Sequence, residues 1–174
     1  LSTGVGSAFA IDIETTATVE LDGSGGVTGT IAEADDADTR LIERCVELGI
    51  EAYGDGTASG GTVETESDVP MAAGLKSSSA AANAAVLATA DAVGADPDPL
   101  SACRLGVRAA RETGVTVTGA FDDASASMWL GTHSCGLPTS ARTPPTPTRS
   151  GVRTSHRWRN WSKTSLSRDG TPRR

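Results

Sequence analysis

The first 128 residues predict an α+β fold, because segments with strand character and segments with helical character follow one another along the chain. The strand segments are rich in β-branched residues, and the helical segments carry apolar residues three and four positions apart. The remaining residues, 129–174, show neither pattern. We therefore expect one folded domain over residues 1–128 and a separate tail over residues 129–174.

The first half of the domain predicts strands around one helix. Residues 8–21 alternate well enough to form one or two strands. A glycine-rich turn follows at 22–26, and we expect residues 27–32 to return as the second strand of a hairpin. Residues 36–52 predict an amphipathic helix, and residues 62–68 predict a short strand. The apolar positions of that helix are Leu41, Ile42, Cys45, Val46 and Leu48.

We expect the second half of the domain to be mostly helical. A run of small residues after Ala80 favours a helix that is narrow enough to pack tightly against a sheet. A further helix is expected over residues 98–113, with Pro99 in its first turn and Gly114 after its end. Residues 115–128 predict a strand or extended segment, a glycine turn, and an acidic pair that leads into another helix.

Charge divides the chain at the same place as the pattern. Residues 1–128 contain 21 acidic and 6 basic side chains, whereas residues 129–174 contain 1 and 9. An acidic surface that is poor in lysine keeps a protein hydrated at high salt, which is consistent with a halophilic source. An ordinary acidic protein from a GC-rich genome explains the same composition equally well.

Three interpretations of the tail compete. Arginines together with Trp158 and Trp161 would suit a nucleic-acid-binding arm, since phosphates attract arginine and bases stack on aromatic rings. The tail could also be a disordered extension, because it is too poor in apolar residues to fold by itself. Out-of-frame translation of GC-rich DNA is the interpretation we favour, since the change is abrupt and interrupts a motif. Nucleic acid is the least favoured partner.

The cysteines and the hydropathy favour a cytoplasmic location. Cys45, Cys103 and Cys135 stand alone, without a CxxC pair, which suits a reducing compartment. No apolar run approaches the roughly 20 residues that span a bilayer, so we expect no membrane partner. The first residues also lack the basic and apolar regions of a signal peptide.

One segment at a strand-to-helix junction has the character of a phosphate-binding loop. It comprises Pro70, Met71, Ala72, Ala73, Gly74, Leu75, Lys76, Ser77, Ser78, Ser79 and Ala80. Glycine lets the backbone approach a phosphate, and amides at a helix N-terminus bind the anion with the helix dipole behind them. Serine hydroxyls add donors or a ligand for Mg²⁺, and the order of residues excludes a Walker loop. From these residues alone, a flexible turn capped by Ser77 is almost equally well supported.

An acidic pair, Asp122 and Asp123, follows the glycine turn near the end of the domain. Two carboxylates in this position can supply a general base or a metal ligand for phosphoryl transfer. The structural alternative is a helix N-cap with a solvated acidic first turn, which is the more common use of such residues.

Together these residues resemble a known family. The pattern PxxxGLxSSxA at 70–80 is similar to the phosphate loop of the GHMP kinases. The segments GSAFAID (6–12), GLKSSSAAANA (74–84) and TGAFDDASAS (118–127) resemble those of archaeal shikimate kinases. Because three motifs occur in the right order over about three-quarters of the chain, the resemblance is specific.

The resemblance implies ATP-dependent phosphorylation of shikimate to shikimate 3-phosphate in aromatic amino-acid biosynthesis, with Mg²⁺ as cofactor. It implies an N-terminal domain like domain 2 of ribosomal protein S5, with a left-handed βαβ unit, and a ferredoxin-like C-terminal domain. Residues 70–80 would bind ATP, Ser78 and Glu112 would hold the metal, and Asp122 would be the catalytic carboxylate. The choice between Asp122 and Asp123 stays open.

Alternatives remain for the function. The acceptor could be homoserine or mevalonate, because these relatives share the phosphate loop. From another class, the chain could be a non-catalytic protein that binds a nucleotide or RNA.

The chain also departs from the family pattern. It begins at Leu1, without the first strand that normally precedes Gly4-x-Gly6, and nothing after residue 128 matches the C-terminal domain. We therefore expect a fragment in which that domain is largely missing and the frame changes near residue 129. Weak or absent kinase activity and a tendency to aggregate are the expected consequences.

Overall fold

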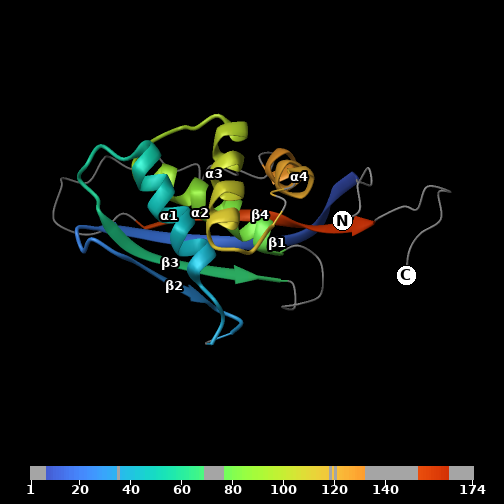
Figure 1. Ribbon diagram of the computed structural model, residues 1–174, viewed down its shortest axis with the longest axis horizontal. Helices are drawn as coiled ribbons and strands as arrows, with labels where there is room; N and C mark the ends of the chain where they lie inside the picture. The colour runs from blue at the N-terminus through green and yellow to red at the C-terminus, as the bar shows by residue number, and fades with distance from the viewer. Residues whose placement is uncertain are drawn as a thin grey trace, which may run out of the picture.

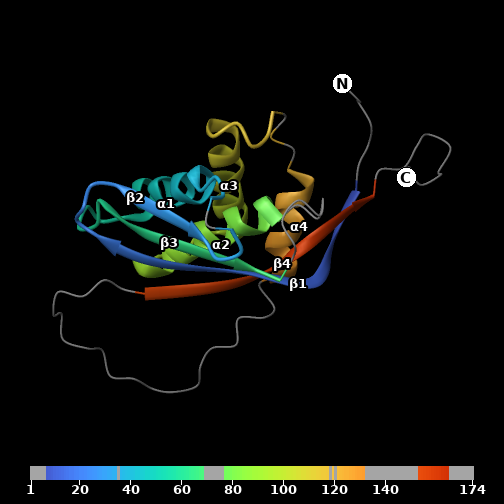
Figure 2. The same cartoon turned by 90° about the horizontal axis from the view of Figure 1, so that it is seen from below.

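The computed structural model describes residues 7–34, 36–68, 77–117, 119, 121–131 and 153–164 of the chain. They form two layers, a sheet and a group of helices that covers one of its faces (Figures 1 and 2). The strands are β1 (Ser7–Asp22), β2 (Val27–Ile31), β3 (Gly60–Ser67) and β4 (Arg153–Thr164). The helices are α1 (Arg40–Tyr53), α2 (Ser77–Ala92), α3 (Pro99–Glu112) and α4 (Asp122–Gly131). The predicted α+β class is confirmed.

The sheet has the order β2-β3-β1-β4. Strand β1 is antiparallel to both of its neighbours, β3 and β4, whereas β2 and β3 are parallel. A parallel pair requires a crossover, and α1 supplies it between β2 and β3. The unit β2-α1-β3 therefore has the βαβ connectivity that the family resemblance implies.

The predicted hairpin between the first two strands is wrong. Strand β2 does not pair with β1, because β3 lies between them. Two glycines make room for β3 at its first residues: a Cβ on Gly60 would lie 2.3 Å from the carbonyl oxygen of Gly26, and one on Gly61 would lie 2.2 Å from that of Glu20. The Gly61 amide donates to the Gly26 carbonyl at 2.9 Å. Strand order thus depends on a contact between distant segments, which a turn motif alone does not reveal.

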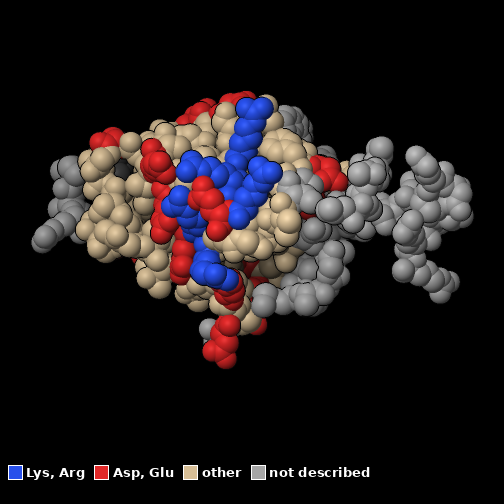
Figure 3. Space-filling model, viewed as in Figure 1, with Lys and Arg blue, Asp and Glu red and all other residues tan. Residues whose placement is uncertain are grey.

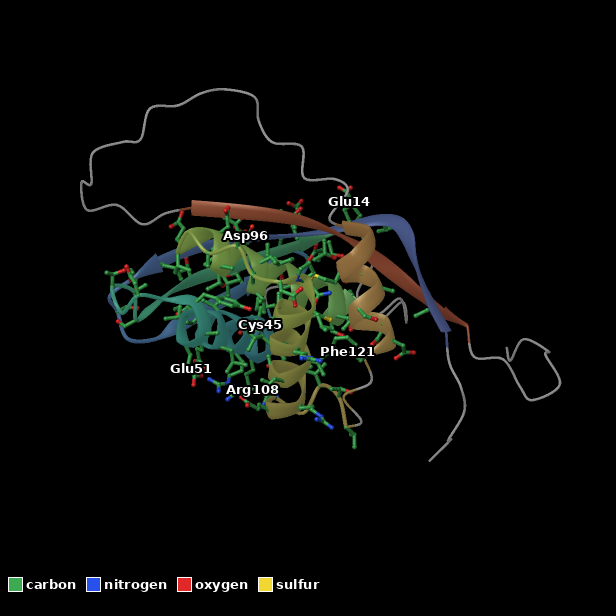
Figure 4. All side chains as sticks on the ribbon, turned by 90° about the horizontal axis from the view of Figure 1, so that it is seen from above. Glu14, Cys45, Glu51, Asp96, Arg108 and Phe121 are labelled. Atoms are coloured by element: carbon green, nitrogen blue, oxygen red, sulfur yellow. The ribbon has the colours of Figure 1, made fainter. Side chains whose placement is uncertain are left out.

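Alternation along the strands places the core between the sheet and the helices. Ala17, Val19 and Leu21 of β1 are buried, as is Val63 of β3, while the residues between them are more exposed. The apolar positions predicted for α1 all lie in this core: Leu41, Ile42, Cys45, Val46 and Leu48. Figure 4 shows Cys45 inside the helical layer, whereas Glu51 and Arg108 project from the side away from the sheet.

Small residues let α2 pack closely on α1, as the alanine-rich sequence predicts. Most of the α2 side chains are buried, including Thr89, whose hydroxyl donates to the Ala85 carbonyl at 2.7 Å. A Cβ on Gly49 of α1 would lie 2.8 Å from the Thr89 methyl carbon. Only glycine at position 49 therefore permits the observed approach of the two helices.

The boundaries of α3 follow the predicted signals. Asp98 caps the helix, since its carboxylate accepts from the Ser101 amide at 3.0 Å, and Pro99 is the first residue. Gly114 has a φ of 77° just after the end of the helix, a conformation that favours glycine. The structure describes no strand at residues 115–117, so the extended segment expected there is not a strand in the described part.

The tail contains a regular element that the sequence does not predict. Helix α4 continues past residue 128 to Gly131, and β4 pairs with β1 over two stretches, with an irregularity between Ala10 and Glu14. The physical reason is that strand pairing uses main-chain groups and needs no apolar pattern in the added strand. Without β4, the corresponding edge of β1 would lack a partner strand in the described sheet. This pairing does not test whether the tail is out of frame.

Helices in the described ranges are too short or too polar to cross a membrane.

Candidate functional site

A cavity of about 290 Å³ opens where the start of α2 meets the ends of β2 and β3. Its walls are largely apolar, and they come from the sheet and from both α1 and α2. The apolar lining includes Ile31, Leu41, Ile42 and Ala81. A few polar groups beside an apolar wall are typical of a site for a small organic ligand.

Serines at the first turn of α2 contribute polar groups to this cavity. Ser77 and Ser78 line it, and both are partly exposed. The first amides of a helix have no partner within the helix, and the helix dipole favours an anion beside them. Ser79 is also partly exposed, whereas Ala80 is fully buried and belongs to the core. The start of α2 therefore has the donors that a phosphate group requires.

The other residues of the predicted phosphate loop lie outside the described part of the chain. They are Pro70, Met71, Ala72, Ala73, Gly74, Leu75 and Lys76. Their role stays a prediction, while Ser77 and Ser78, which follow them, line the cavity.

Three polar residues on the sheet side form a linked rim of the cavity. The hydroxyl groups of Thr15 and Ser67 lie 3.0 Å apart and share a hydrogen bond. The Ser67 amide donates to the carboxylate of Glu33, in the segment after β2. All three residues line the cavity, as Ser77 and Ser78 of α2 also do. The rim is therefore held in place before any ligand arrives.

The predicted acidic pair, Asp122 and Asp123, lies in the first turn of α4. This position suits a catalytic role, and it also suits the structural alternative of an acidic helix start. Asp122 is partly exposed, whereas Asp123 is only 6% exposed. The thiol of Cys103 in α3 has its pKa raised to about 12, first by burial and then by the negative charge of Asp123. Asp123 therefore faces the helical layer near α3, and Asp122 is the more accessible carboxylate of the two.

Helix α4 packs beside the N-terminal half of α2, to which Asn83 belongs (Figures 1 and 2). The contact is fixed by Asn83, whose side-chain amide donates to the Ala124 carbonyl at 2.9 Å and to the Ser127 hydroxyl at 2.8 Å. Asn83 is not among the site residues that the sequence motifs predict. The signal was present, because a lone asparagine interrupts an otherwise apolar run of alanines.

Glu112, the predicted metal ligand, lies in an ion-pair cluster. Its Oε1 accepts from Nε of Arg108 at 2.7 Å, and its Oε2 accepts from Nε of Arg44 at 2.6 Å. These hydrogen bonds, from Arg108 first and Arg44 second, lower the pKa of the Glu112 carboxyl. Figure 3 shows the same cluster as interleaved basic and acidic side chains over α1 and α3.

The Mg²⁺ that the family resemblance implies does not find its predicted ligand set in this arrangement. Both carboxylate oxygens of Glu112 already accept from arginines. Among the described residues, no group of three or more acidic, histidine or cysteine side chains could hold a metal ion. Ser78 remains able to offer a hydroxyl at the cavity, but one hydroxyl is too small a ligand set for this ion.

Comparison with known proteins identifies relatives of this chain. Residues 40–131 match the family described as GHMP kinases N terminal domain. A shikimate kinase of Halobacterium salinarum is 63% identical over 131 residues, which cover 74% of this chain and 45% of that protein. A shikimate kinase of Methanosarcina mazei is 59% identical over 129 residues, covering 74% and 43%. The chain thus matches less than half the length of these relatives.

Two solved structures share the fold. A mevalonate kinase aligns with a TM-score of 0.50 at 10% identity, covering 65% of this chain and 50% of that one. The mevalonate kinase of Methanococcus jannaschii also aligns with a TM-score of 0.50, at 11% identity, covering 71% and 52%. At this level of identity the likeness concerns the fold alone.

Proposed function

Because this chain belongs to the GHMP kinase family, we propose that it forms the ATP-binding part of an enzyme that phosphorylates shikimate. The observation that carries the proposal is the cavity at the start of α2, where an apolar wall meets Ser77 and Ser78. That combination suits a nucleotide, since its base is flat and apolar on its faces and its phosphates are anionic.

The nucleoside of ATP would occupy the cavity. A volume of about 290 Å³ lies close to the lower end of the range for small-molecule sites, and it suits a base with part of its sugar. Leu41, Ile42 and Ala81 would pack on the base, while Glu33 and the Thr15–Ser67 pair offer polar partners at the rim.

The phosphates would lie at the N-terminus of α2. The amides and hydroxyls of its first turn are donors, and the glycine of the preceding loop, Gly74, would let the backbone approach closely. Lys76 would add a positive charge. Phosphoryl transfer depends chiefly on such positioning and on stabilising the charge of the phosphates.

The acceptor hydroxyl would be oriented or deprotonated by Asp122. Its partial exposure at the first residue of α4 supports this choice, whereas Asp123 is nearly buried. A general base must reach the proton that it removes, so accessibility favours Asp122. Mg²⁺ as the companion of ATP, with Ser78 as a ligand, stays a prediction. Glu112 is not proposed as a ligand, because both of its carboxylate oxygens accept from arginines.

Shikimate is favoured over homoserine and mevalonate by identity. The relatives at 63% and 59% identity are shikimate kinases, while the mevalonate kinases share only the fold at 10% and 11%. A cytoplasmic location is consistent with the thiols of Cys45 and Cys103, which are both free and buried. Since the chain covers under half of the shikimate kinases, activity of this chain is part of the proposal and requires its own measurement.

The decisive experiment compares nucleotide binding by the parent chain and by the Ser78→Ala variant, using calorimetric titration with ATP. We expect the parent to bind ATP and the variant to bind it about tenfold more weakly, because a hydrogen bond to a charged group is lost. Ser59→Ala is the matched control, because Ser59 is exposed in the loop before β3 and does not line the cavity. Equal affinity of all three proteins, or no binding to the parent, would contradict the proposal.

Turnover tests the acceptor and the base. Transfer of the terminal phosphate from labelled ATP to shikimate is measured beside transfer to homoserine and mevalonate. We expect turnover by this chain to be weak, since it covers under half of its relatives, with shikimate as the preferred acceptor. Asp122→Asn should lower whatever rate the parent shows by about 10²–10⁴, the usual contribution of a general base. A larger loss in Asp123→Asn than in Asp122→Asn, with both proteins folded, would reverse the assignment.

A further inference from the structure

Asn83 is a fully buried polar residue that joins two helices. It lies in α2, and its Nδ2 donates both to the carbonyl oxygen of Ala124 and to the hydroxyl of Ser127, at 2.9 and 2.8 Å. Both acceptors belong to the first turns of α4. The two bonds therefore fix the helix at the end where its acidic pair begins.

These bonds specify position more than they add stability. The other polar atom of the side chain, Asn83 Oδ1, is buried and has no hydrogen-bond partner among the described residues. It lies close to α3, since a Cβ on Gly106 would be 3.4 Å away from it. A buried acceptor without a partner destabilises a fold, and an apolar side chain of similar size would avoid this cost. Asparagine at this position is thus best explained by what its amide donors hold in place.

The residues at the two helix starts are those of the proposed site. Ser77 and Ser78 begin α2 and line the cavity, while Asp122 begins α4. Asn83 lies less than two turns after Ser78, and its acceptor Ala124 is two residues after Asp122. The path from the nucleotide-binding serines to the acidic pair therefore runs through a short piece of each helix and one side chain.

We propose that Asn83 is a positioning residue, which fixes the acidic pair of α4 relative to the nucleotide-binding start of α2. The inference rests on the proposed function. It assigns to Asn83 no contact with substrate: its part is to keep Asp122 at a constant place with respect to the bound phosphates. Removing the amide should therefore loosen α4 without weakening nucleotide binding.

The test uses the chain carrying Asn83→Leu, an apolar replacement of similar size that leaves both acceptors without this donor. Hydrogen exchange is measured on the α4 and α3 amides. We expect exchange in α4 to become about tenfold faster or more, because its acceptors lose a buried partner, while exchange in α3 stays within about threefold. Ser127→Ala removes one acceptor at a smaller structural cost and should show a weaker effect of the same kind, should the leucine variant not fold.

The second readout separates positioning from general stability. ADP with Mg²⁺ is titrated into each protein while the backbone amide resonances of Asp122 and Asp123 are followed. In the parent we expect ADP to shift both resonances. In Asn83→Leu the ADP affinity should stay within about threefold, but the shift should disappear. Thr89→Val is the matched control, since Thr89 is also fully buried in α2 but bonds only within that helix.

Each outcome has one meaning. An Asn83→Leu protein with unchanged exchange in α4 and a preserved shift overturns the inference, and so does a Thr89→Val protein that loses the shift as well. Failure of the parent to bind ADP overturns the proposed function and, with it, the link between Asn83 and a nucleotide. In that case the exchange data alone still decide whether Asn83 holds α4.

Discussion

Arg44 of α1 and Glu112 of α3 are joined by an ion pair in which Nε of the arginine lies 2.6 Å from Oε2 of the glutamate. The pair links two helices that are 68 positions apart at these residues. Arg108 donates to the other carboxylate oxygen at 2.7 Å, and Arg44 also pairs with Glu47. Shared partners reduce the entropy that each single pair loses, so the cluster is better suited than an isolated surface pair to fix α1 against α3.

Replacement of Glu112 by glutamine should lower the melting temperature in a pH-dependent way. The pKa of Glu112 is lowered in the folded state, by Arg108 first and by Arg44 second. Its contribution is therefore present above the ordinary carboxyl pKa and is lost as the pH falls through the lowered value. We expect the variant to melt below the parent at pH 7 and to match it once the parent carboxylate is protonated, with the difference reduced at high salt.

The matched control for this measurement is Glu51→Gln, which removes an exposed carboxylate of α1 that projects away from the sheet (Figure 4). It should change the melting temperature little at either pH. A deficit in the Glu112→Gln protein that is the same at neutral and acid pH would show that packing, rather than charge, explains the effect.

The same variant distinguishes the two roles of Glu112. The family resemblance predicts a metal ligand, whereas the structure places both oxygens against arginines. We expect the Glu112→Gln protein to retain the difference in ATP affinity that the parent shows between Mg²⁺ and a chelator, as measured by titration in the two conditions. Loss of that difference in a folded variant would restore the predicted metal role.

Alanine at position 60 should destabilise the fold strongly. A Cβ there would lie 2.3 Å from the Gly26 carbonyl oxygen and 2.6 Å from the Gly26 amide nitrogen, so the backbone itself must move. Overpacking of this kind costs about 1–3 kcal/mol, or more where backbone atoms collide. Urea unfolding of Gly60→Ala should show this loss, while Gly23→Ala, with no atom within 4 Å of its Cβ, should unfold close to the parent.

The sequence predicts the individual helices and strands more readily than it predicts which strands pair with one another. Apolar spacing located α1, although the helix begins at Arg40 and not at the predicted residue 36. The boundaries of α3 follow from local signals at Asp98 and Gly114, which act within a few residues. The partner of β2 could not be obtained in this way. It depends on Gly60 and Gly61 fitting against the turn at Gly26, and local pattern carries no information on that contact.

The candidate site shows the same division. Its serines and its acidic pair were recognisable, because a phosphate-binding helix start and a helix that begins with carboxylates have local signatures. The connection between the start of α2 and the start of α4 was not recognisable, because the bonds of Asn83 to Ala124 and Ser127 span more than 40 positions. The cavity beside Ser78 also escaped prediction, since its walls come from five separate elements, β1, β2, β3, α1 and α2.

Removal of residues 132–174 tests whether the tail belongs to the fold. In the structure β4 pairs with residues 7–10 and 14–20 of β1. The truncated chain would therefore present a long edge of β1 with free main-chain groups. We expect this truncated chain to associate at lower concentration than the full chain, as measured by light scattering, and to lose protection from hydrogen exchange along β1. A truncated chain that stays monomeric with β1 unchanged would show that β4 does not support the sheet, as the out-of-frame interpretation of the tail predicts.

Salt-sensitive RNA binding that the full chain shows and the truncated chain lacks would instead assign the basic tail to nucleic acid, because release of counterions from phosphates makes such binding fall steeply with salt.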